Sequence, residues 1–298
     1  MLVEMAVADA YAIAWEFARK KQPAPIDFTK FLQHPTYAEL LPGQYTDDTQ
    51  RAIANIDVML HEEAGALFTP IAYAESYVAA YNRDRREGYS RGFQALLKSV
   101  SNGGEFLTTV QRTKASNGSV MGVAPLGLIG DMASLKVAAT IQAITSHHPA
   151  TAIHAQIIAM SAHYFAHCNG DPEDLQGWIM NNADWVDGTD DSYRWSYLVD
   201  SHDQGLGTSI KASSISSYVV YAVTKFDKLT HIIHDAIDRG GDTDSAAASA
   251  VAVASLCPDI ENDIPQHLID AMDAANPGFG VDYLRNLEAQ LRAEYKVF

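Results

Sequence analysis

The sequence Tyr45-Thr46-Asp47-Asp48-Thr49-Gln50 places two adjacent carboxylates between two threonine hydroxyl groups. Apolar residues follow it at helical spacing, which predicts a helix that begins here with Thr46 as its N-cap. The free N–H groups at a helix start and the positive end of the helix dipole favour ionised carboxylates, the form that ligates a metal. Many ordinary helices have an acidic first turn, so the meaning of this pair depends on the rest of the chain.

A second stretch, Gly240-Gly241-Asp242-Thr243-Asp244-Ser245, repeats this construction near the other end of the chain. Its glycine pair allows a tight turn, and the run of small, mostly apolar residues at 246–256 predicts a buried helix. If the two helix starts face each other, they form a site made only of oxygen ligands. Such a site suits magnesium, manganese or calcium, whereas zinc normally draws on His and Cys.

Together the two stretches, Thr-Asp-Asp-Thr after Gly-x-Tyr and a late Gly-Gly-Asp-Thr-Asp-Ser, resemble the metal motifs of the ADP-ribosylglycohydrolase family. The resemblance implies a compact orthogonal multi-helix bundle that holds two Mg²⁺ ions, with Mn²⁺ as an alternative. By motif position, it implies the following metal ligands: Thr46, Asp47, Asp48, Asp242, Asp244 and Ser245. Ser245 stands where many members have Thr, so a hydroxyl group is kept.

Composition predicts one all-α domain over residues 1–298. Apolar residues make up 47% of the chain, mostly at helical spacing, and no linker divides it. The formal net charge is -16, and basic residues are scattered apart from Arg83, Arg85 and Arg86. This pattern argues against DNA or RNA binding as the main role. An acidic protein that binds an anionic nucleotide would use metal ions and helix N-termini instead.

The chain is expected to be cytoplasmic. Cys168 and Cys257 are too few for a disulfide framework, which favours a reducing compartment. The apolar N-terminal stretch is interrupted by Glu4, Asp9 and Glu16, unlike a signal peptide. The longest mostly apolar run, at 246–257, is too short to span a bilayer, so no membrane association is expected.

Residues 2–18 read as one helix, in which the seven-residue spacing would put Asp9 and Glu16 on the same face. The stretch resembles the family pattern Gly-Asp-Ala-x-Gly-x-x-x-Glu-Phe, with Ala8 and Ala12 in place of both glycines. The resemblance implies that Glu16 engages the scissile centre or its water, that Asp9 is a supporting acid, and that Asp48 completes the catalytic set. The two added methyl groups are expected to alter the pocket locally.

The segment 82–93 joins two predicted helices and is either a solvated loop or a loop beside the substrate. It resembles the family segment Gly-Tyr-Gly-x-Gly, with Ser90 replacing the middle glycine, which implies that Tyr89 lines the pocket. The small-residue loop 116–127 precedes a helix expected near Asp131. Its backbone N–H groups could approach phosphate oxygens, although many such loops are ordinary connections.

The loop 116–127 resembles Ser-Asn-Gly-x-x-Met-Arg-x-x-Pro-x-Gly, which contacts the diphosphate and ribose in the family. Gly122 stands where Arg is usual. A further segment, Thr145-Ser146-His147-His148-Pro149, resembles Thr-His-x-His-Pro with Ser146 in place of the first histidine and His147 as its possible substitute. The implied substrate-binding residues of these two segments are Asn117, Gly118, Ser119, Met121, Ser146 and His147.

Two further segments are interpreted as structural. His163 and His167 have the i,i+4 spacing of a zinc pair, but no third ligand is obvious, so partner-satisfied structural histidines are expected. The acidic loop 184–191 does not match an EF-hand and is expected either to be solvated or to lie at the rim of the pocket.

Three functions are compatible with these motifs. The leading hypothesis is magnesium-dependent hydrolysis of the glycosidic bond at ribose C1 of ADP-ribosylated protein side chains or related ADP-ribosyl compounds, through an oxocarbenium-like transition state. The departures at Ala8, Ala12, Gly122 and Ser146 motivate a second, a glycosidase for another small ribosyl nucleoside or nucleotide. The third is a catalytically silent ADP-ribose-binding or structural relative. Retention of all six metal ligands argues against it, because buried acids without a cation are destabilising.

Overall fold

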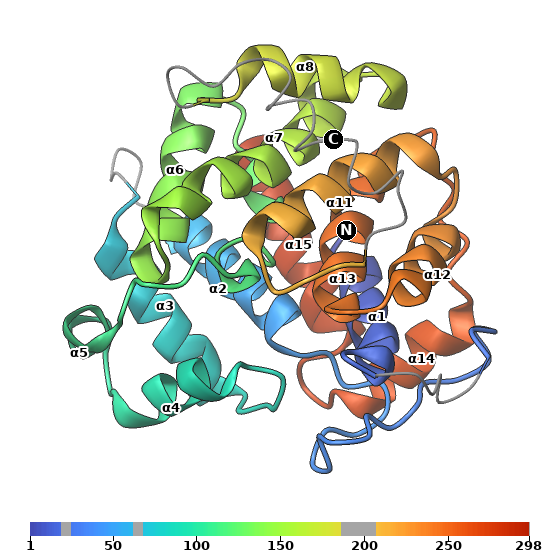
Figure 1. Cartoon of the computed structure of the whole chain (residues 1–298), viewed down its shortest axis with the longest axis horizontal. Helices are drawn as coiled ribbons and strands as arrows, with labels where there is room; N and C mark the ends of the chain where they lie inside the picture. Colours follow the sequence, from blue (N-terminus) through green and yellow to red (C-terminus); the bar gives the residue numbers. More distant parts are fainter. Residues whose placement is uncertain (19–24, 62–67, 186–206, 298) are drawn as a thin grey trace.

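A computed structural model of the chain describes residues 1–18, 25–61, 68–185 and 207–297. Its regular structure is helical, and β-structure in these ranges is limited to two isolated bridges. The fold is therefore all-α, as the sequence predicts (Figure 1). The α-helices are α1 (Leu2–Ala12), α2 (Asp47–His61), α3 (Pro70–Arg83), α4 (Arg91–Ser99), α5 (Gly103–Thr109), α6 (Met132–Ser146), α7 (Ala152–Cys168), α8 (Leu175–Asn182), α11 (Ala212–Lys225), α12 (Leu229–Arg239), α13 (Thr243–Ala254), α14 (Gln266–Ala275) and α15 (Val281–Tyr295).

Short 3₁₀ helices occur where loops pack closely against the bundle. They are η1 (Ile13–Trp15), η2 (Asn117–Ser119), η3 (Ala124–Leu128), η4 (Pro149–Thr151) and η5 (Pro172–Asp174). The predicted helix start near Asp131 is confirmed, because Asp131 is the N-cap of α6 and its side chain accepts from the Ser134 N–H. The predicted connection between two helices at 82–93 is also confirmed, since it joins α3 to α4.

Two alanine-rich helices from opposite ends of the chain form the centre of the bundle. Every residue of α13 is buried, and so is every residue of α1 except Glu4. They pack more extensively against each other than any other pair of elements, and both lie near the middle of the molecule in Figure 1. Small side chains allow this close approach. The Thr243 hydroxyl donates to the Ala12 carbonyl at 2.8 Å, which fixes the C-terminal end of α1 against the start of α13.

Helix α2 brings the first acidic motif to this centre. It begins at Asp47 and buries most of its length against α3, α15, η3 and the central pair. The amide of Asn55 donates to the Gly122 carbonyl at 2.6 Å and so holds the small-residue loop against the helix. The start of α2 and the start of α13 therefore come together in the interior, as the two motifs require.

The first helix ends earlier than the sequence spacing predicts. After α1 and η1, Glu16 has backbone angles of φ -53° and ψ 120°, which are not helical. Phe17 follows at φ +48°, and its N–H donates to the Gly241 carbonyl at 2.8 Å. The prediction that Asp9 and Glu16 share one face of a single helix is therefore wrong, because this contact with the second motif turns the chain away.

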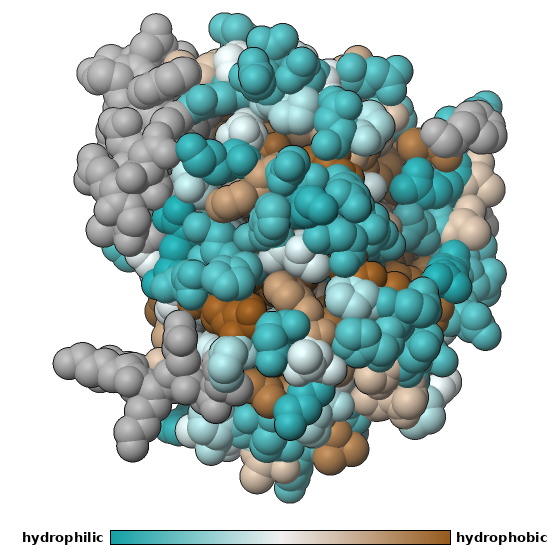
Figure 2. Space-filling view, turned by 90° about the vertical axis from the view of Figure 1, so that its right-hand side faces the viewer, coloured by the Kyte–Doolittle hydropathy of each residue, from teal (hydrophilic) through white to brown (hydrophobic). Residues whose placement is uncertain are grey.

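The surface and the cysteines complete the description. Figure 2 shows one face of the molecule, on which hydrophilic side chains predominate and hydrophobic areas are small and separate. Cys168 and Cys257 are both free thiols. Within the described residues, none of the helices combines the length and apolar character that crossing a bilayer would need.

Candidate active site

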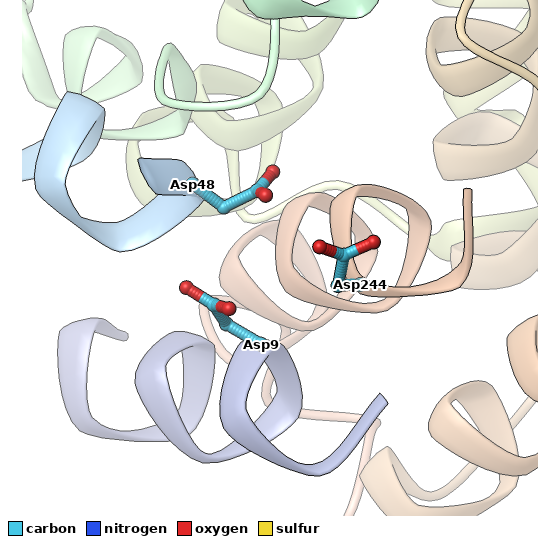
Figure 3. A group of neighbouring side chains, drawn as sticks. All are labelled: Asp9, Asp48 and Asp244. Carbon is cyan, nitrogen blue, oxygen red and sulfur yellow. The ribbon is translucent and has the colours of Figure 1, made fainter. Parts of the chain in front are cut away.

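Three aspartates from distant segments point toward one another at the centre of the bundle (Figure 3). Asp9 belongs to α1, Asp48 to α2 and Asp244 to α13, and each offers a carboxylate oxygen within 4.8 Å of the other two. A second group with the same spacing contains Glu16, Asp242 and Asp244. Because Asp244 belongs to both groups, the acids form one continuous cluster.

Asp9 differs from the other acids because its oxygens are occupied by hydrogen bonds. Its Oδ1 accepts from the Thr46 hydroxyl at 2.7 Å, and its Oδ2 accepts from the Thr46 N–H at 2.9 Å, the Thr49 N–H at 3.1 Å and the Thr49 hydroxyl at 2.7 Å. Burial raises the pKa of Asp9, and the bonds from Thr49 and Thr46 oppose that effect. The Asp9 carboxylate therefore holds the start of α2 and lies beside Asp48 and Asp244, which is compatible with the supporting role that the family resemblance implies.

The same contacts correct the predicted capping role of Thr46. The residue precedes α2 as expected, but its hydroxyl donates to Asp9 instead of accepting from the first N–H groups of the helix. The cap therefore comes from another helix. Asp9 supplies the acceptor for the Thr49 N–H in the first turn of α2. The Thr46 oxygen keeps its lone pairs, so its proposed role as a metal ligand is compatible with this contact.

The second motif reaches the cluster through a turn that only glycine can make. Gly241 has φ +90°, and a Cβ atom there would lie 1.8 Å from the Thr208 carbonyl oxygen. The chain then enters α13 with Asp242 at the N-cap and Asp244 in the first turn. The Ser245 hydroxyl donates to Asp48 Oδ2 at 3.3 Å and accepts from the Asn117 amide at 2.9 Å. Two acidic motifs and the small-residue loop thus meet at Ser245.

The acids open into a cavity of about 230 Å³ that carries both negative and positive side chains. Five of its lining residues are carboxylic acids, and the others include two cations. The acidic residues are Glu16, Asp47, Asp48, Asp242 and Asp244. The remaining lining residues include Tyr37, Arg51, Gly88, Ser90, Phe93, Lys114, Ser116, Asn117, Gly118, Met121 and His147.

Burial and mutual repulsion raise the pKa values of the acids. Burial and the charges of Asp242 and Asp47 raise the pKa of Glu16 to about 9. Burial and the neighbouring Asp9 raise the pKa of Asp47 to about 8. The pKa values of Asp48 and Asp244 are also raised, chiefly by burial. A cation would remove this repulsion.

The arrangement fits a bound cation. Asp48 Oδ1 and Asp244 Oδ1 are buried and have no hydrogen-bond partner in the described part of the chain. None of the lysine and arginine nitrogens in those ranges lies within 4.0 Å of the five acids that line the cavity. Buried carboxylates without partners are costly, and a hard cation with oxygen ligands would satisfy them.

A sequence model described as ADP-ribosylglycohydrolase matches residues 1–297. The chain belongs to the ADP-ribosylglycohydrolase family. Its fold is similar to a solved structure described as "ADP-ribosylglycohydrolase-related protein complex", with a TM-score of 0.70. The two share 20% sequence identity over 99% of this chain and 95% of that chain, a likeness that bears on the fold alone. No curated protein matches the chain in a sequence comparison.

The structure places only part of the predicted substrate-binding set at the cavity wall. Asn117, Gly118, Met121 and His147 line the cavity. The side chain of Ser119 turns away, since its hydroxyl donates to the Ser116 carbonyl at 2.7 Å.

Tyr89 and Ser146 also lie behind the cavity wall. Tyr89 is buried, donates to Gln50 Oε1 at 2.9 Å and stacks on Phe93. The expectation that Tyr89 lines the pocket is thus corrected, because its neighbours Gly88 and Ser90 face the cavity instead. Ser146 Oγ contacts His147 Nδ1 at 2.8 Å and accepts from Arg51 at 3.3 Å.

The four departures from the family pattern have different structural consequences. Ala8 and Ala12 are fully buried in the α1–α13 contact and lie outside the cavity wall, so the expected change of pocket shape does not arise from them. Gly122 packs against α2, where a Cβ atom would lie 2.5 Å from the Ala52 nitrogen. Gly122 and Ser146 do not line the cavity themselves, but each directly neighbours a residue that does, Met121 and His147.

Sequence reasoning missed several residues at the cavity. Arg51, Tyr37, Phe93 and Lys114 all line it. Arg51 is four residues after Asp47 on α2, so helical spacing could have placed it on the same face. Tyr37 and Lys114 lie in loops between helices, where spacing gives no comparable signal.

The two segments interpreted as structural stand as follows. The rings of His163 and His167 lie 4.6 Å apart, and their nitrogens contact the carbonyls of Ile129 and Leu128 at 3.0 Å. Each ring therefore has a backbone carbonyl as a partner, as expected for structural histidines. Of the acidic loop, residues 186–191 lie outside the described ranges, and Asp184 pairs with Lys136 at 2.6 Å.

Proposed function

We propose that this ADP-ribosylglycohydrolase is a magnesium-dependent hydrolase that cleaves the glycosidic bond at ribose C1 of ADP-ribosylated protein side chains or related ADP-ribosyl compounds. The observation that carries the proposal is that five carboxylates from three segments line a single cavity. The substrate would be a modified protein or a small ADP-ribosyl compound. The two free thiols accord with a cytoplasmic site of action.

The metal would be held by Thr46, Asp47 and Asp48 from the first motif and by Asp242, Asp244 and Ser245 from the second. All six residues are hard oxygen donors, which suits Mg²⁺ or Mn²⁺. When bound, two such ions would polarise the ribose hydroxyl groups and a water molecule. The unpartnered oxygens of Asp48 and Asp244 support this assignment.

Glu16 is the proposed proton carrier. It lies outside the helices, at the edge of the acidic group and within reach of Asp242 and Asp244. Hydrolysis joins the water oxygen to C1 and breaks the bond from C1 to the leaving nitrogen or oxygen, which must gain a proton. A carboxyl group with a raised pKa suits such a transfer near neutral pH. Neutralising Asp242 and Asp47 would bring the pKa of Glu16 down from about 9 toward that range.

The remaining acids would stabilise charge. Positive charge develops on the ribose ring in an oxocarbenium-like transition state, and the carboxylates of the cavity would stabilise it. Asn117 and Gly118 line the same cavity, and Asn117 donates to Ser245 of the second acidic motif, so both would orient the sugar.

A substrate panel tests the proposal. ADP-ribosyl-arginine, ADP-ribosyl-serine and free nucleosides would each be incubated with the full chain and Mg²⁺, and release of ribose-containing product would be measured. We expect turnover of at least one ADP-ribosyl compound and its loss in EDTA. Turnover of free nucleosides alone would favour the second function, and magnesium-dependent ADP-ribose binding without turnover would favour the silent relative.

A further inference from the structure

The cavity that the acids line also carries positive charge, in a chain whose formal net charge is -16. Arg51 and Lys114 both line it, next to His147. We propose that Arg51 is the residue by which this cavity binds a phosphate group of its ligand. The inference deepens the proposed function and rests on it, since Arg51 lines the same cavity as the acids.

Arg51 is a buried cation whose hydrogen bonds are incomplete. Its side chain is 2% exposed. Nη2 donates to the Gly118 carbonyl at 3.0 Å and to Ser146 Oγ at 3.3 Å, whereas Nε and Nη1 have no hydrogen-bond partner among the described residues. The guanidinium carbon lies 3.6 Å from the centre of the Tyr77 ring. A guanidinium cannot lose its proton in a protein, so these two N–H groups remain strong unpaired donors.

No acid in the described ranges neutralises this charge by direct contact. Every ion pair there involves other cations, and the carboxylates of the cavity lie more than 4.0 Å from the Arg51 nitrogens. A buried charge is normally paired. Two unpartnered donors on the planar fork of a residue that lines the cavity match the geometry of a phosphate or carboxylate group.

Other groups in the cavity cannot replace Arg51. Burial, and then the charges of Arg51 and Lys114, lower the pKa of His147 to about 3, so its ring is neutral. Lys114 is exposed at the rim and brings a mobile charge. The neighbouring loop cannot contribute a side chain at Gly122, because a Cβ atom there would lie 2.6 Å from the Arg51 backbone carbon. Of the two cations that line the cavity, Arg51 is thus the one that is buried and held in place by hydrogen bonds.

The two kinds of charged group in the cavity together define the ligand class. The acids suit a divalent cation and sugar hydroxyl groups, and Arg51 suits an anion. A ligand that reaches both is a phosphorylated sugar or a nucleoside diphosphate sugar. A carboxylate could supply the same charge, and ADP-ribose, inorganic pyrophosphate and acetate distinguish these sources as separate probes.

Binding of these probes to Arg51→Met and Arg51→Lys tests the inference by calorimetry with saturating Mg²⁺. We expect Arg51→Met to weaken ADP-ribose and pyrophosphate binding about 10–100-fold, the range for a hydrogen bond to a charged group. Arg51→Lys should retain part of the affinity because it keeps the charge. Acetate binding that exceeds pyrophosphate binding would overturn the choice of phosphate.

Arg112→Met is the matched control. Arg112 also donates to backbone carbonyls of this region, those of Ile144 and Thr145 at 3.0 Å, but it does not line the cavity. The Arg112→Met substitution should leave the affinity for ADP-ribose within about threefold of the wild-type value. Magnesium affinity, measured separately, distinguishes recognition from a structural role. An Arg51→Met variant that loses Mg²⁺ and ADP-ribose affinity by the same factor, or neither, would overturn the inference.

A crystal structure of the wild-type chain with ADP-ribose and Mg²⁺ tests the inference without relying on the folding of any variant. We expect a phosphate oxygen within roughly 3.2 Å of an Arg51 nitrogen. Phosphates bound elsewhere would overturn the inference alone, provided that hydrolysis is observed. Arg51-dependent ADP-ribose binding by a chain that hydrolyses no ADP-ribosyl compound would instead overturn the proposed function alone.

Discussion

The carboxylate of Asp9 holds Thr46 by both its hydroxyl group and its backbone N–H, at 2.7 Å and 2.9 Å. A residue of the first helix thereby fixes the residue that precedes Asp47 and Asp48. The contact gives the side chain of Asp9 a role although it lies outside the cavity wall. We propose that Asp9 is a positioning residue, and that its effect on chemistry passes through the acids of α2.

Two substitutions of Asp9 distinguish positioning from acid–base chemistry. Asp9→Ala leaves two N–H groups and two hydroxyls without their acceptor, which should cost about 2–4 kcal/mol of unfolding free energy. Asp9→Asn keeps an acceptor for the three Oδ2 contacts, and the Thr46 hydroxyl can turn to accept from the amide. We expect it to cost less than half as much and to retain turnover.

Urea denaturation and turnover measured with Mg²⁺ check this expectation. Asp131→Asn provides a control, because Asp131 caps α6 at the surface with the same kind of bond. If Asp9→Asn abolished turnover as fully as Asp9→Ala while the protein stayed folded, Asp9 would have a chemical role and the positioning account would be wrong.

The sequence predicts the two acidic motifs of this site better than it predicts the other residues that line the cavity. The acidic motifs could be paired because their residue types and helix starts are local features, and the structure brings both to one cavity. The course of the chain after Ala12 could not be predicted, because it depends on a hydrogen bond from Phe17 to Gly241. Local spacing has no information about such a distant contact.

Side-chain direction in loops was equally beyond sequence reasoning. Tyr89 was expected at the cavity and lies in the core, whereas Gly88 and Ser90 face the cavity. Adjacent loop residues point in different directions, and only packing decides which faces the ligand. The family resemblance named the segment correctly but could not resolve the direction of one side chain.

Gly122→Ala tests the close packing of the small-residue loop 116–127 against α2, which leaves no room for a side chain at position 122. The added Cβ would meet the Ala52 nitrogen at 2.5 Å and the Arg51 carbon at 2.6 Å, both backbone atoms that cannot move independently. We expect a loss of about 1–3 kcal/mol of unfolding free energy. Chemical denaturation measures it.

Gly92→Ala is the matched control for that substitution. A Cβ at Gly92 meets nothing within 4 Å, and the residue lies in α4. Alanine there should be neutral or stabilising by up to about 1 kcal/mol, because glycine weakens a helix. Equal stability of the two variants would show that the loop does not pack against α2 as described.

His154 predicts a pH dependence of stability that is separate from the acidic site. It is buried, its Nδ1 contacts the Ser216 hydroxyl at 2.9 Å, and burial lowers its pKa from 6.5 to about 4. The unfolded chain therefore binds a proton at a pH where the folded chain does not. Stability from this group is present above about pH 6.5 and is lost as pH falls toward 4, by about 3 kcal/mol.

His154→Gln should remove this dependence, since glutamine does not titrate and can still contact Ser216. Unfolding free energies of wild type and variant, measured between pH 7 and pH 4, isolate the contribution by difference. The wild type should lose stability relative to the variant as the pH falls, by about 3 kcal/mol in all. Parallel curves would show that His154 is protonated equally in the folded and unfolded states.

Magnesium-dependent turnover of ADP-ribosyl-arginine and ADP-ribosyl-serine by wild type, Asp48→Ala and Asp244→Ala is the most direct test of the central claim. The account predicts turnover that requires Mg²⁺, stops in EDTA and falls to below about one-hundredth of the wild-type rate in each variant, because each loses a buried metal ligand. Turnover of wild-type magnitude in both variants, insensitive to EDTA, would contradict it.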